Sequence, residues 1–224
     1  MLLALAPVAQ AADIEVAPEP MGLGWYVSVF GGWSHAKDES GSFETTAAVS
    51  SAAYYFDLEL DDGFTAGIAL GAQINEWLRG EVELSGNWHD AEGFVEFDDS
   101  SPDATTLDGD ETALFALANL WLEVPIGLGP LRPYAGGGVG FGRLDLDIET
   151  SGSTLFDDAD WGFAWQLGAG VAFDVSESIA IDVGYRYKRI ENVDIEVEDV
   201  FGDSSDIEKD YKSHNFLVGL RFGF

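Results

Sequence analysis

The sequence predicts an all-β fold, a transmembrane eight-stranded antiparallel up-and-down β-barrel with four long acidic extracellular loops. Three observations predict it. Short segments alternate apolar and polar side chains, the connections between them alternate in length, and tryptophans lie near both ends of the segments. The last segment ends on an aromatic residue and carries an apolar side chain at every second position, at Phe216, Val218, Leu220, Phe222 and Phe224.

The alternation predicts eight strands, at residues 25–34, 64–75, 78–89, 113–123, 133–147, 161–175, 179–188 and 215–224. The third is the clearest, because apolar residues and glycines alternate with Arg79, Glu81 and Glu83. The connections after the second, fourth and sixth strands are short and the others are long, which places every long loop at one end. The facing of the fifth strand stays open, since Phe141 shares its parity with Arg143, and a bulge or a lumenal cleft of glycines would reconcile them.

Composition limits the class of protein. The chain has 224 residues, 46% of them hydrophobic, which excludes wholesale disorder despite a net charge of -31. No apolar run is long enough for a transmembrane helix, and a mean hydropathy of +0.03 is compatible with a barrel of alternating strands. Residues 1–11 are predicted to be a secretory signal peptide with a truncated start, residues 12–21 a periplasmic leader and residues 22–224 the barrel. A soluble lipocalin-like barrel, with its apolar face inside, is the alternative.

Aromatic residues at both ends of the strands favour the membrane. Tryptophan is enriched where a membrane meets water, so the strand ends should carry two girdles. The predicted girdle residues are Trp25 and Trp77 at the short-turn end and Trp33, Trp88 and Trp161 at the loop end.

Eight strands enclose a lumen just wide enough to be filled by side chains. Alternation directs four basic and four acidic residues into it, at Arg79, Glu81, Glu83, Glu123, Asp182, Arg186, Lys188 and Arg221. An unpaired buried charge is costly, so a balanced set predicts an ion-pair network that plugs the lumen. A narrow ion path lined by the same residues is the alternative.

Four segments carry a resemblance to a known family: residues 24–32, 132–140, 184–187 and 216–224. With them the chain resembles the small OmpA/OmpX-type outer-membrane barrels of Gram-negative bacteria, most closely the alphaproteobacterial "porin family" surface antigens. The resemblance implies a bacterial outer-membrane location, with loops extracellular and both termini periplasmic, surrounded by lipid and lipopolysaccharide. It also implies that the aromatic C-terminal strand is a signal for the barrel-assembly machinery.

The acidic residues decide which partners are expected. The chain has 41 acidic and 10 basic residues, and most of the acidic ones fall in the predicted long loops. Such a field repels nucleic acid and attracts cations, so no nucleic-acid partner is expected. No segment matches a compact metal site, so neither a cofactor nor a metal site is predicted, and weak binding of Ca²⁺ or Mg²⁺ to the loops stays open.

Catalysis would need a nucleophile and a base at one site. The histidines are His35, His89 and His214, and with Ser34 or Ser213 a Ser-His-Asp arrangement or a two-histidine metal site is conceivable. The sequences around Ser34 and Ser213 match neither the deacylase nor the palmitoyltransferase patterns of outer-membrane barrels. The sequence therefore predicts a non-enzymatic surface protein with a role in outer-membrane integrity. The alternatives are a surface adhesin or receptor that binds an unknown extracellular ligand through its loops and, next, a narrow cation-preferring channel.

Overall fold

The computed structural model describes residues 24–37, 39–47, 50–97, 105–124, 129–150, 153–198 and 204–224. The predicted signal peptide and leader lie outside the described residues. Ten strands form the described part of the chain. No helix there is long and apolar enough to cross a membrane.

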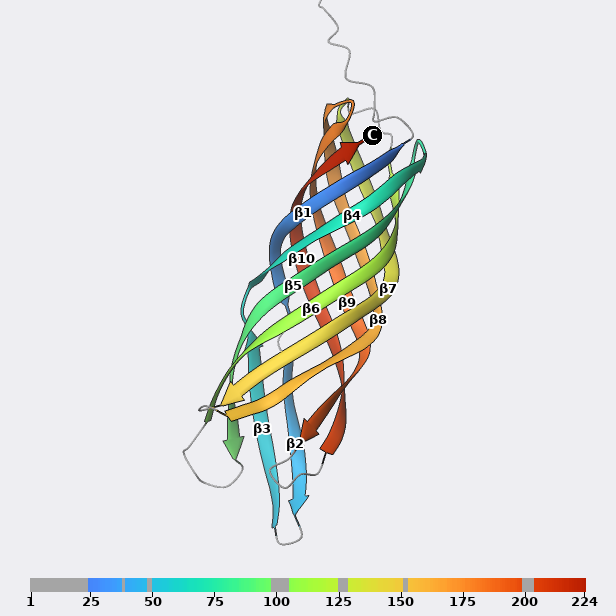
Figure 1. Cartoon of the computed structure of the whole chain (residues 1–224). Coiled ribbons are helices and arrows are strands. Elements are labelled where there is room, and N and C mark those ends of the chain that lie inside the picture. Colours follow the sequence, from blue (N-terminus) through green and yellow to red (C-terminus); the bar gives the residue numbers. More distant parts are fainter. Residues whose placement is uncertain are drawn as a thin grey trace, which may run out of the picture.

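Eight of the ten strands close into one barrel. Its members are β1 (Trp25–Ala36), β4 (Gly63–Asn75), β5 (Leu78–Phe97), β6 (Thr105–Glu123), β7 (Leu131–Thr150), β8 (Ser153–Ser176), β9 (Ile179–Glu198) and β10 (Ser204–Gly223). The order around the barrel is β4-β1-β10-β9-β8-β7-β6-β5, all pairs are antiparallel, and β5 pairs with β4 again (Figure 1). Closure gives every barrel strand two hydrogen-bonded neighbours, as lipid requires. The predicted eight-stranded up-and-down barrel is confirmed.

The two remaining strands, β2 (Glu39–Ala47) and β3 (Ser50–Leu60), form a hairpin within the first predicted long loop. β3 pairs with the far end of β5, from Leu60 opposite Ala91 to Tyr54 opposite Phe97. The hairpin therefore prolongs the barrel at the end opposite the C-terminus (Figure 1).

The prediction that the acidic residues lie in long loops is wrong for much of the chain. The strand β5 runs to Phe97 rather than 89, and β6 begins at Thr105 rather than 113, so Asp90 and Asp110 are strand residues. Likewise β9 runs to Glu198 and β10 begins at Ser204. The physical reason is that alternation continues beyond the predicted strand ends, with the outer position taken by acidic instead of apolar residues.

The outer face of the barrel is apolar between the two rows of tryptophans. Side chains exposed there by 40% or more include Val29, Phe64, Ile68, Leu70, Val82, Leu84, Leu120, Val139, Phe141, Leu167, Val183 and Val218. We call this region the spanning part. The segments beyond Trp33, Phe64, Trp88, Trp161 and Phe216 toward the long connections, together with the hairpin, are the distal part.

Strand β7 shows how the two parts join. Its register with β6 is continuous from Tyr134 to Glu149, so the bulge considered for this strand is absent. Phe141 and Arg143 both point outward, because the strand leaves the spanning part between them, while Leu144 and Leu146 are buried inside. The inner positions within the spanning part are Gly136, Gly138, Gly140 and Gly142, and neighbouring side chains such as Asn119 and Ile190 occupy the space in front of them.

A hydrophobic core fills the barrel toward its distal end. Its members are Ala36, Ala91, Ala113, Phe115, Leu117, Leu144, Leu146, Ala164, Ile190, Val193 and Tyr211. A bulge in β9, where Ile190 faces Tyr211 and Val193 faces Lys209, keeps both apolar residues inside. The interior of the barrel is thus apolar at its distal end, and it is ionic closer to the short turns.

Candidate functional site

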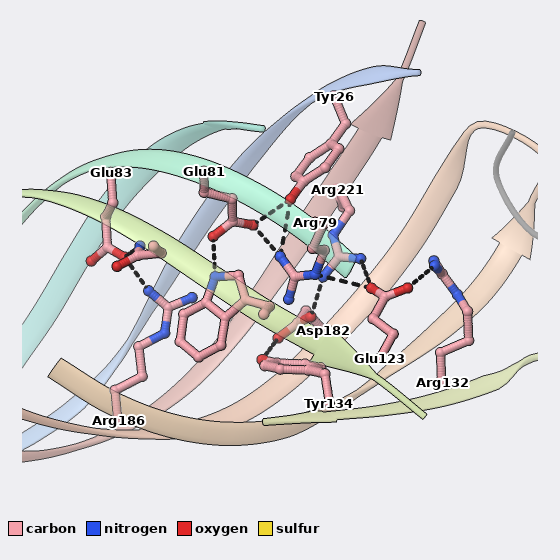
Figure 2. Close-up of polar contacts among 12 residues, drawn as sticks. Tyr26, Arg79, Glu81, Glu83, Glu123, Arg132, Tyr134, Asp182, Arg186 and Arg221 are labelled. Carbon is pink, nitrogen blue, oxygen red and sulfur yellow. Dashed lines mark hydrogen bonds and ion pairs between the residues drawn. The ribbon is translucent and has the colours of Figure 1, made fainter. Parts of the chain in front are cut away.

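The charged lumen of the spanning part is the candidate site. All eight charged residues predicted to face inward do so, from β5, β6, β9 and β10 (Figure 2 shows seven of them with their neighbours). Arg79, Glu83, Lys188 and Arg221 are each no more than 2% exposed. Alternation explains this placement, because these residues have an outward apolar residue or glycine on either side, except that Lys188 lies between Tyr187 and Arg189.

Glu83 is the centre of the group of charges that lies nearer the distal part. Its carboxylate accepts hydrogen bonds from Arg186 Nη1 at 2.5 Å and from Lys188 Nζ at 2.9 Å. The same carboxylate accepts from Asn119 Nδ2 at 2.9 Å and Gln166 Nε2 at 2.8 Å. Donors from three strands, β6, β8 and β9, therefore converge on one acid. Strand direction predicts that Arg186 and Lys188 lie across from Glu81 and Glu83, and both form their ion pairs with Glu83.

Glu81 and Glu123 surround Arg79 in a second group of charges, which lies nearer the short turns. Arg79 forms an ion pair with Glu81 and a second one with Glu123, at 2.9 Å from Nε to Oε1. Glu81 also accepts hydrogen bonds from the hydroxyl of Tyr26 at 2.7 Å and from Nε1 of Trp121 at 2.6 Å (Figure 2). Both carboxylates are buried and carry several charge-assisted bonds, which is the condition for a buried charge to be tolerated.

A fifth cation and a fifth acid belong to this network and were missed in the sequence. Arg132 donates to Glu123 at 2.7 Å and to both carboxylate oxygens of Asp174, at 2.6 and 2.8 Å. Arg221 pairs with Glu123 at 3.2 Å and with Asp182 at 2.8 Å, and so completes a closed set of five cations and five carboxylates. The signal in the sequence is that Arg132 shares its parity with Tyr134, and Asp174 with Ala172. It does not suffice for Arg132, because alternation alone leaves the facing of β7 open.

Aromatic rings stack between the lumenal cations, and these too were missed. The Arg79 guanidinium lies 4.7 Å from the ring centre of Tyr134 and 5.5 Å from that of Trp121. The Arg186 guanidinium lies 5.1 Å from the ring centre of the same Trp121 and 4.7 Å from that of Phe30. Lys188 continues the series at 4.8 Å from Phe115. Cation–π contacts of this kind are strongest where water is excluded.

Glycines make room for these rings. A Cβ built on Gly71 would lie 2.2 Å from Cζ of Tyr26, and one on Gly67 would lie 2.5 Å from Cζ of Phe30. On the opposite wall a Cβ on Gly170 would lie 2.5 Å from the Tyr134 hydroxyl. Each of these glycines is the direct cross-strand partner of the ring that covers it, so a ring on one strand fills the space over the glycine on the next strand.

A polar layer, which includes the buried Glu111 beside His89, separates the ion-pair network of the lumen from the hydrophobic core. Asn87 donates to Tyr211 and to Ser213, both at 2.9 Å. His89 Nε2 lies 2.9 Å from Oγ of Ser34, and all these residues are buried. The lumen thus changes in three steps, from ion-paired through polar to apolar.

The structure brings His35 and His214 together as direct cross-strand partners, but it pairs neither of them with the serine next to it in the sequence. His35 and His214 point outward whereas Ser34 and Ser213 point inward, because adjacent residues on a strand face opposite sides. His35 Nδ1 contacts Asp62 at 2.8 Å, and His214 Nδ1 contacts the hydroxyl of Tyr185 at 2.6 Å. Among the described residues, no group of three or more His, Cys, Asp or Glu side chains could hold a metal ion.

The remaining predicted residues lie on the outer face. Trp25, Trp33, Trp77 and Trp161 are exposed by 43% to 60%, and Trp88 is half-buried because its ring stacks on Phe64 at 4.7 Å. The C-terminal strand points five apolar side chains outward: Phe216, Val218, Leu220, Phe222 and Phe224.

Comparison with known proteins agrees with the fold. The family described as "Outer membrane protein beta-barrel domain" matches residues 1–224. An uncharacterised protein of Brucella abortus is 25% identical over the whole chain and 95% of its own length. Outer membrane protein X of Enterobacter cloacae is 34% identical over 58 residues, which are 26% of this chain and 33% of that protein.

Two solved structures share the barrel. OprG from Pseudomonas aeruginosa has a TM-score of 0.57 and 15% identity, covering 92% of this chain and 100% of that one. Neisserial surface protein A has a TM-score of 0.50 and 20% identity, covering 90% and 97%. At these identities the likeness concerns the fold.

Proposed function

This chain belongs to the outer-membrane β-barrel family, and we propose that it is a non-enzymatic structural protein of the outer membrane with a closed lumen. The observation that carries the proposal is the buried set of five cations and five carboxylates, packed against aromatic rings across the spanning part. A hydrated path would leave these charges in contact with water, whereas here Arg79, Glu83 and Lys188 are each at most 1% exposed.

The proposal includes an orientation. Short turns and both termini lie on the periplasmic side, and the distal part, with its acidic outer positions, lies outside the cell. Extracellular carboxylates attract cations from the medium, among them Ca²⁺ and Mg²⁺, without a dedicated ligand set. The barrel would then contribute to outer-membrane integrity by packing against lipid and by concentrating the divalent ions that hold anionic headgroups together.

Deletion of the encoding gene tests this role. A structural barrel predicts that the deletion strain becomes more sensitive to detergents and large hydrophobic antibiotics, with sensitivity restored by the wild-type chain. Uptake of small hydrophilic solutes should not fall in the deletion strain. Unchanged detergent sensitivity together with reduced solute uptake would contradict the structural role and favour a channel.

A second candidate function is surface interaction through the distal part. The observation that favours it is that β5, β6, β9 and β10 and the β2–β3 hairpin continue as paired strands beyond the aromatic residues, over a hydrophobic core. A rigid platform suits recognition. Cells that express the wild-type chain should adhere to immobilised matrix glycoproteins, and a variant in which a short Gly-Ser connection replaces residues 40–57 should not. Equal adherence would remove this candidate.

The non-enzymatic part of the proposal is supported by the histidine geometry. His89 is the histidine that contacts a serine, and both that serine and His89 are buried, at 0% and 3% exposed. A nucleophile needs access to its substrate. Wild-type and His89→Asn chains should therefore leave the lipid A composition of the host cell equally unchanged, and a modification that depends on His89 would overturn this part.

A further inference from the structure

The outer face of β9, β10 and β1 carries three cross-strand rows of side chains at its distal end. Direct cross-strand partners form each row, because the register places Trp33 opposite Phe216 and His35 opposite His214. The backbone N–H of Lys37 continues this ladder by donating to the carbonyl of Lys212 at 3.0 Å. From the spanning part outward, the rows are Trp33, Phe216 and Tyr185, then His35, His214 and Tyr187, then Lys37, Lys212 and Arg189.

The first row fixes the height of the other two. The ring centres of Trp33 and Phe216 are 5.5 Å apart, and those of Phe216 and Tyr185 are 5.3 Å apart, which makes a continuous aromatic surface. Aromatic residues of this kind mark the boundary of the hydrocarbon region. Successive rows are two residues apart, about 7 Å along a strand and about 5 Å along the normal of a tilted barrel. The histidine and cation rows therefore lie in the zone of the lipid headgroups.

Basic residues are rare in this chain, and their distribution is uneven. Of the 10 basic residues, five fill the lumen: Arg79, Arg132, Arg186, Lys188 and Arg221. The other five all lie beyond the aromatic row, at Lys37, Arg143, Arg189, Lys209 and Lys212. Three of those five make one row on neighbouring strands, in a protein whose net charge is -31.

The opposite side of the distal part carries the opposite charge. Asp90 on β5 is the direct partner of Asp110 on β6, which is the direct partner of Asp147 on β7, and all three are exposed. The distal part is therefore electrostatically two-sided. A phosphate group would be repelled along β5, β6 and β7 and attracted along β9, β10 and β1.

Like charges directly opposite each other on a sheet are unfavourable unless an anion lies between them. Lys212 is the direct partner of Arg189, and Asp210 lies 2.5 Å from the guanidinium and 3.7 Å from the ammonium. Glu191 adds a contact of 3.4 Å to Arg189. The hydrogen bond to Asp210 raises the pKa of Arg189 above its usual value, so the guanidinium stays charged. Three cations face two carboxylates, and each of the three retains solvent-exposed surface for a further anion.

We propose that the outer face of β9, β10 and β1 binds the phosphorylated glucosamine headgroup of lipid A in the outer leaflet. Lys37, Lys212 and Arg189 contact its phosphates, and its acyl chains pack against Trp33 and Phe216. The proposal rests on the orientation proposed above, because only a distal part outside the cell meets this lipid. The charge complementarity and the height of the row favour a membrane phosphate over a neighbouring copy of the chain.

The test uses the full chain refolded in uncharged detergent micelles. Bisphosphorylated lipid A and the same lipid without phosphates are titrated, and binding is followed by tryptophan fluorescence. The triple variant Lys37→Gln, Arg189→Gln, Lys212→Gln should bind bisphosphorylated lipid A about 100-fold more weakly, at about fivefold per cation near a charged surface. Salt should weaken wild-type binding and have little effect on the variant.

The matched control is Arg143→Gln, which removes an exposed cation from β7 that is paired with Asp145 at 3.2 Å. It should change affinity by less than about twofold, since the proposed site is elsewhere on the barrel. Heat-modifiable migration on gels reports that each variant is folded.

Three results would overturn the proposal: equal affinity for the two lipids, an equal effect of the control, or a triple variant that changes oligomeric state instead of lipid affinity. The last result would identify an interface between copies. Failure of the proposed function would give other results. Conductance through folded protein would contradict the closed lumen, and surface labelling of the short-turn end on intact cells would contradict the proposed orientation.

Discussion

The spanning part and the distal part of this barrel are built from the same strands with opposite chemistry. On β7 the spanning part turns Val139 and Phe141 outward and glycines inward, while the distal part turns Asp147 outward and Leu144 and Leu146 inward. Neither the register with β6 nor the parity changes between them. What changes is the solvent around the barrel.

Different interactions stabilise the strands in water and in lipid. In water, burial of Leu144 and its neighbours supplies the hydrophobic stabilisation of an ordinary core. In lipid the outer face is already surrounded by hydrocarbon, so the interior can be polar provided that every charge is paired. The ion pairs of Glu83 and the rings around Arg79 meet that condition. Substitutions in the ionic and in the hydrophobic interior, and on the lipid-facing and the water-facing outer surface, should therefore change the free energy of unfolding by different amounts.

The largest effect is expected from Glu83→Gln. This change leaves Arg186 and Lys188 buried without their carboxylate, which should lower the free energy of unfolding by about 3–5 kcal/mol. Urea unfolding in lipid vesicles, followed by tryptophan fluorescence, measures it. The control is Glu191→Gln in the distal part, where an exposed pair with Arg189 is worth no more than about 1 kcal/mol. Equal losses for both variants would mean that the lumenal network does not stabilise the barrel.

The hydrophobic interior of the distal part is tested by Leu144→Ala. Leu144 is 1% exposed and lies in the distal core, so its truncation should lower the free energy of unfolding by about 2–5 kcal/mol. Val139→Ala on the same strand removes an outward side chain and should cost less than about 1 kcal/mol. The same unfolding measurement applies, and a larger loss for Val139→Ala would reverse the assignment of the two faces.

The two outer faces are compared on β5. Val82 is 62% exposed near the middle of the spanning part, so Val82→Arg should destabilise the barrel in a bilayer by about 2–4 kcal/mol. Asp90→Arg, on the same face in the distal part, should stay within about 0.5 kcal/mol of the wild type. If arginine is tolerated equally at both positions, the boundary at Trp88 is misplaced.

A smaller effect is expected from the glycines that receive the lumenal rings. Gly71→Ala places a Cβ against the ring of Tyr26, which its hydrogen bond to Glu81 holds in place, and should cost about 1–3 kcal/mol. Gly80→Ala meets its nearest neighbour at 3.5 Å on the outer face and should be tolerated. Midpoints of urea unfolding decide this, and indistinguishable midpoints would show that the lumen is loosely packed.

Much of the fold was predictable, because alternation is a local property of the chain. The parity of Glu81 and Glu83 places both acids in the lumen as soon as the strand is recognised. The facing of β7 was not predictable in this way: Phe141 and Arg143 share a face, and only the change of solvent between them explains the pair. The lengths of β5 and β9 were underestimated for the same reason, since acidic residues at outer positions were interpreted as loops.

Only some of the partners within the lumen could be predicted from the sequence: strand direction places Arg79 near Glu123 and Asp182 near Arg221, and both pairs are present. Which side chains meet across a barrel depends on strand tilt and shear, which fix the relative heights of distant strands. Strand direction does not show that Glu83 pairs with both Arg186 and Lys188 while Glu81 pairs with Arg79, or that Arg132 pairs with Asp174. Tyr134 and Trp121 were missed as partners of Arg79 for the same reason.

Single-channel recording in planar lipid bilayers tests most directly whether the ionic lumen is closed. The account predicts that folded wild-type protein, verified by heat-modifiable migration, gives no reproducible conductance steps, with or without Ca²⁺, because the paired charges and packed rings leave no hydrated path. Reproducible cation-selective steps from the same folded protein would contradict it and would make the lumenal charges the lining of a narrow channel.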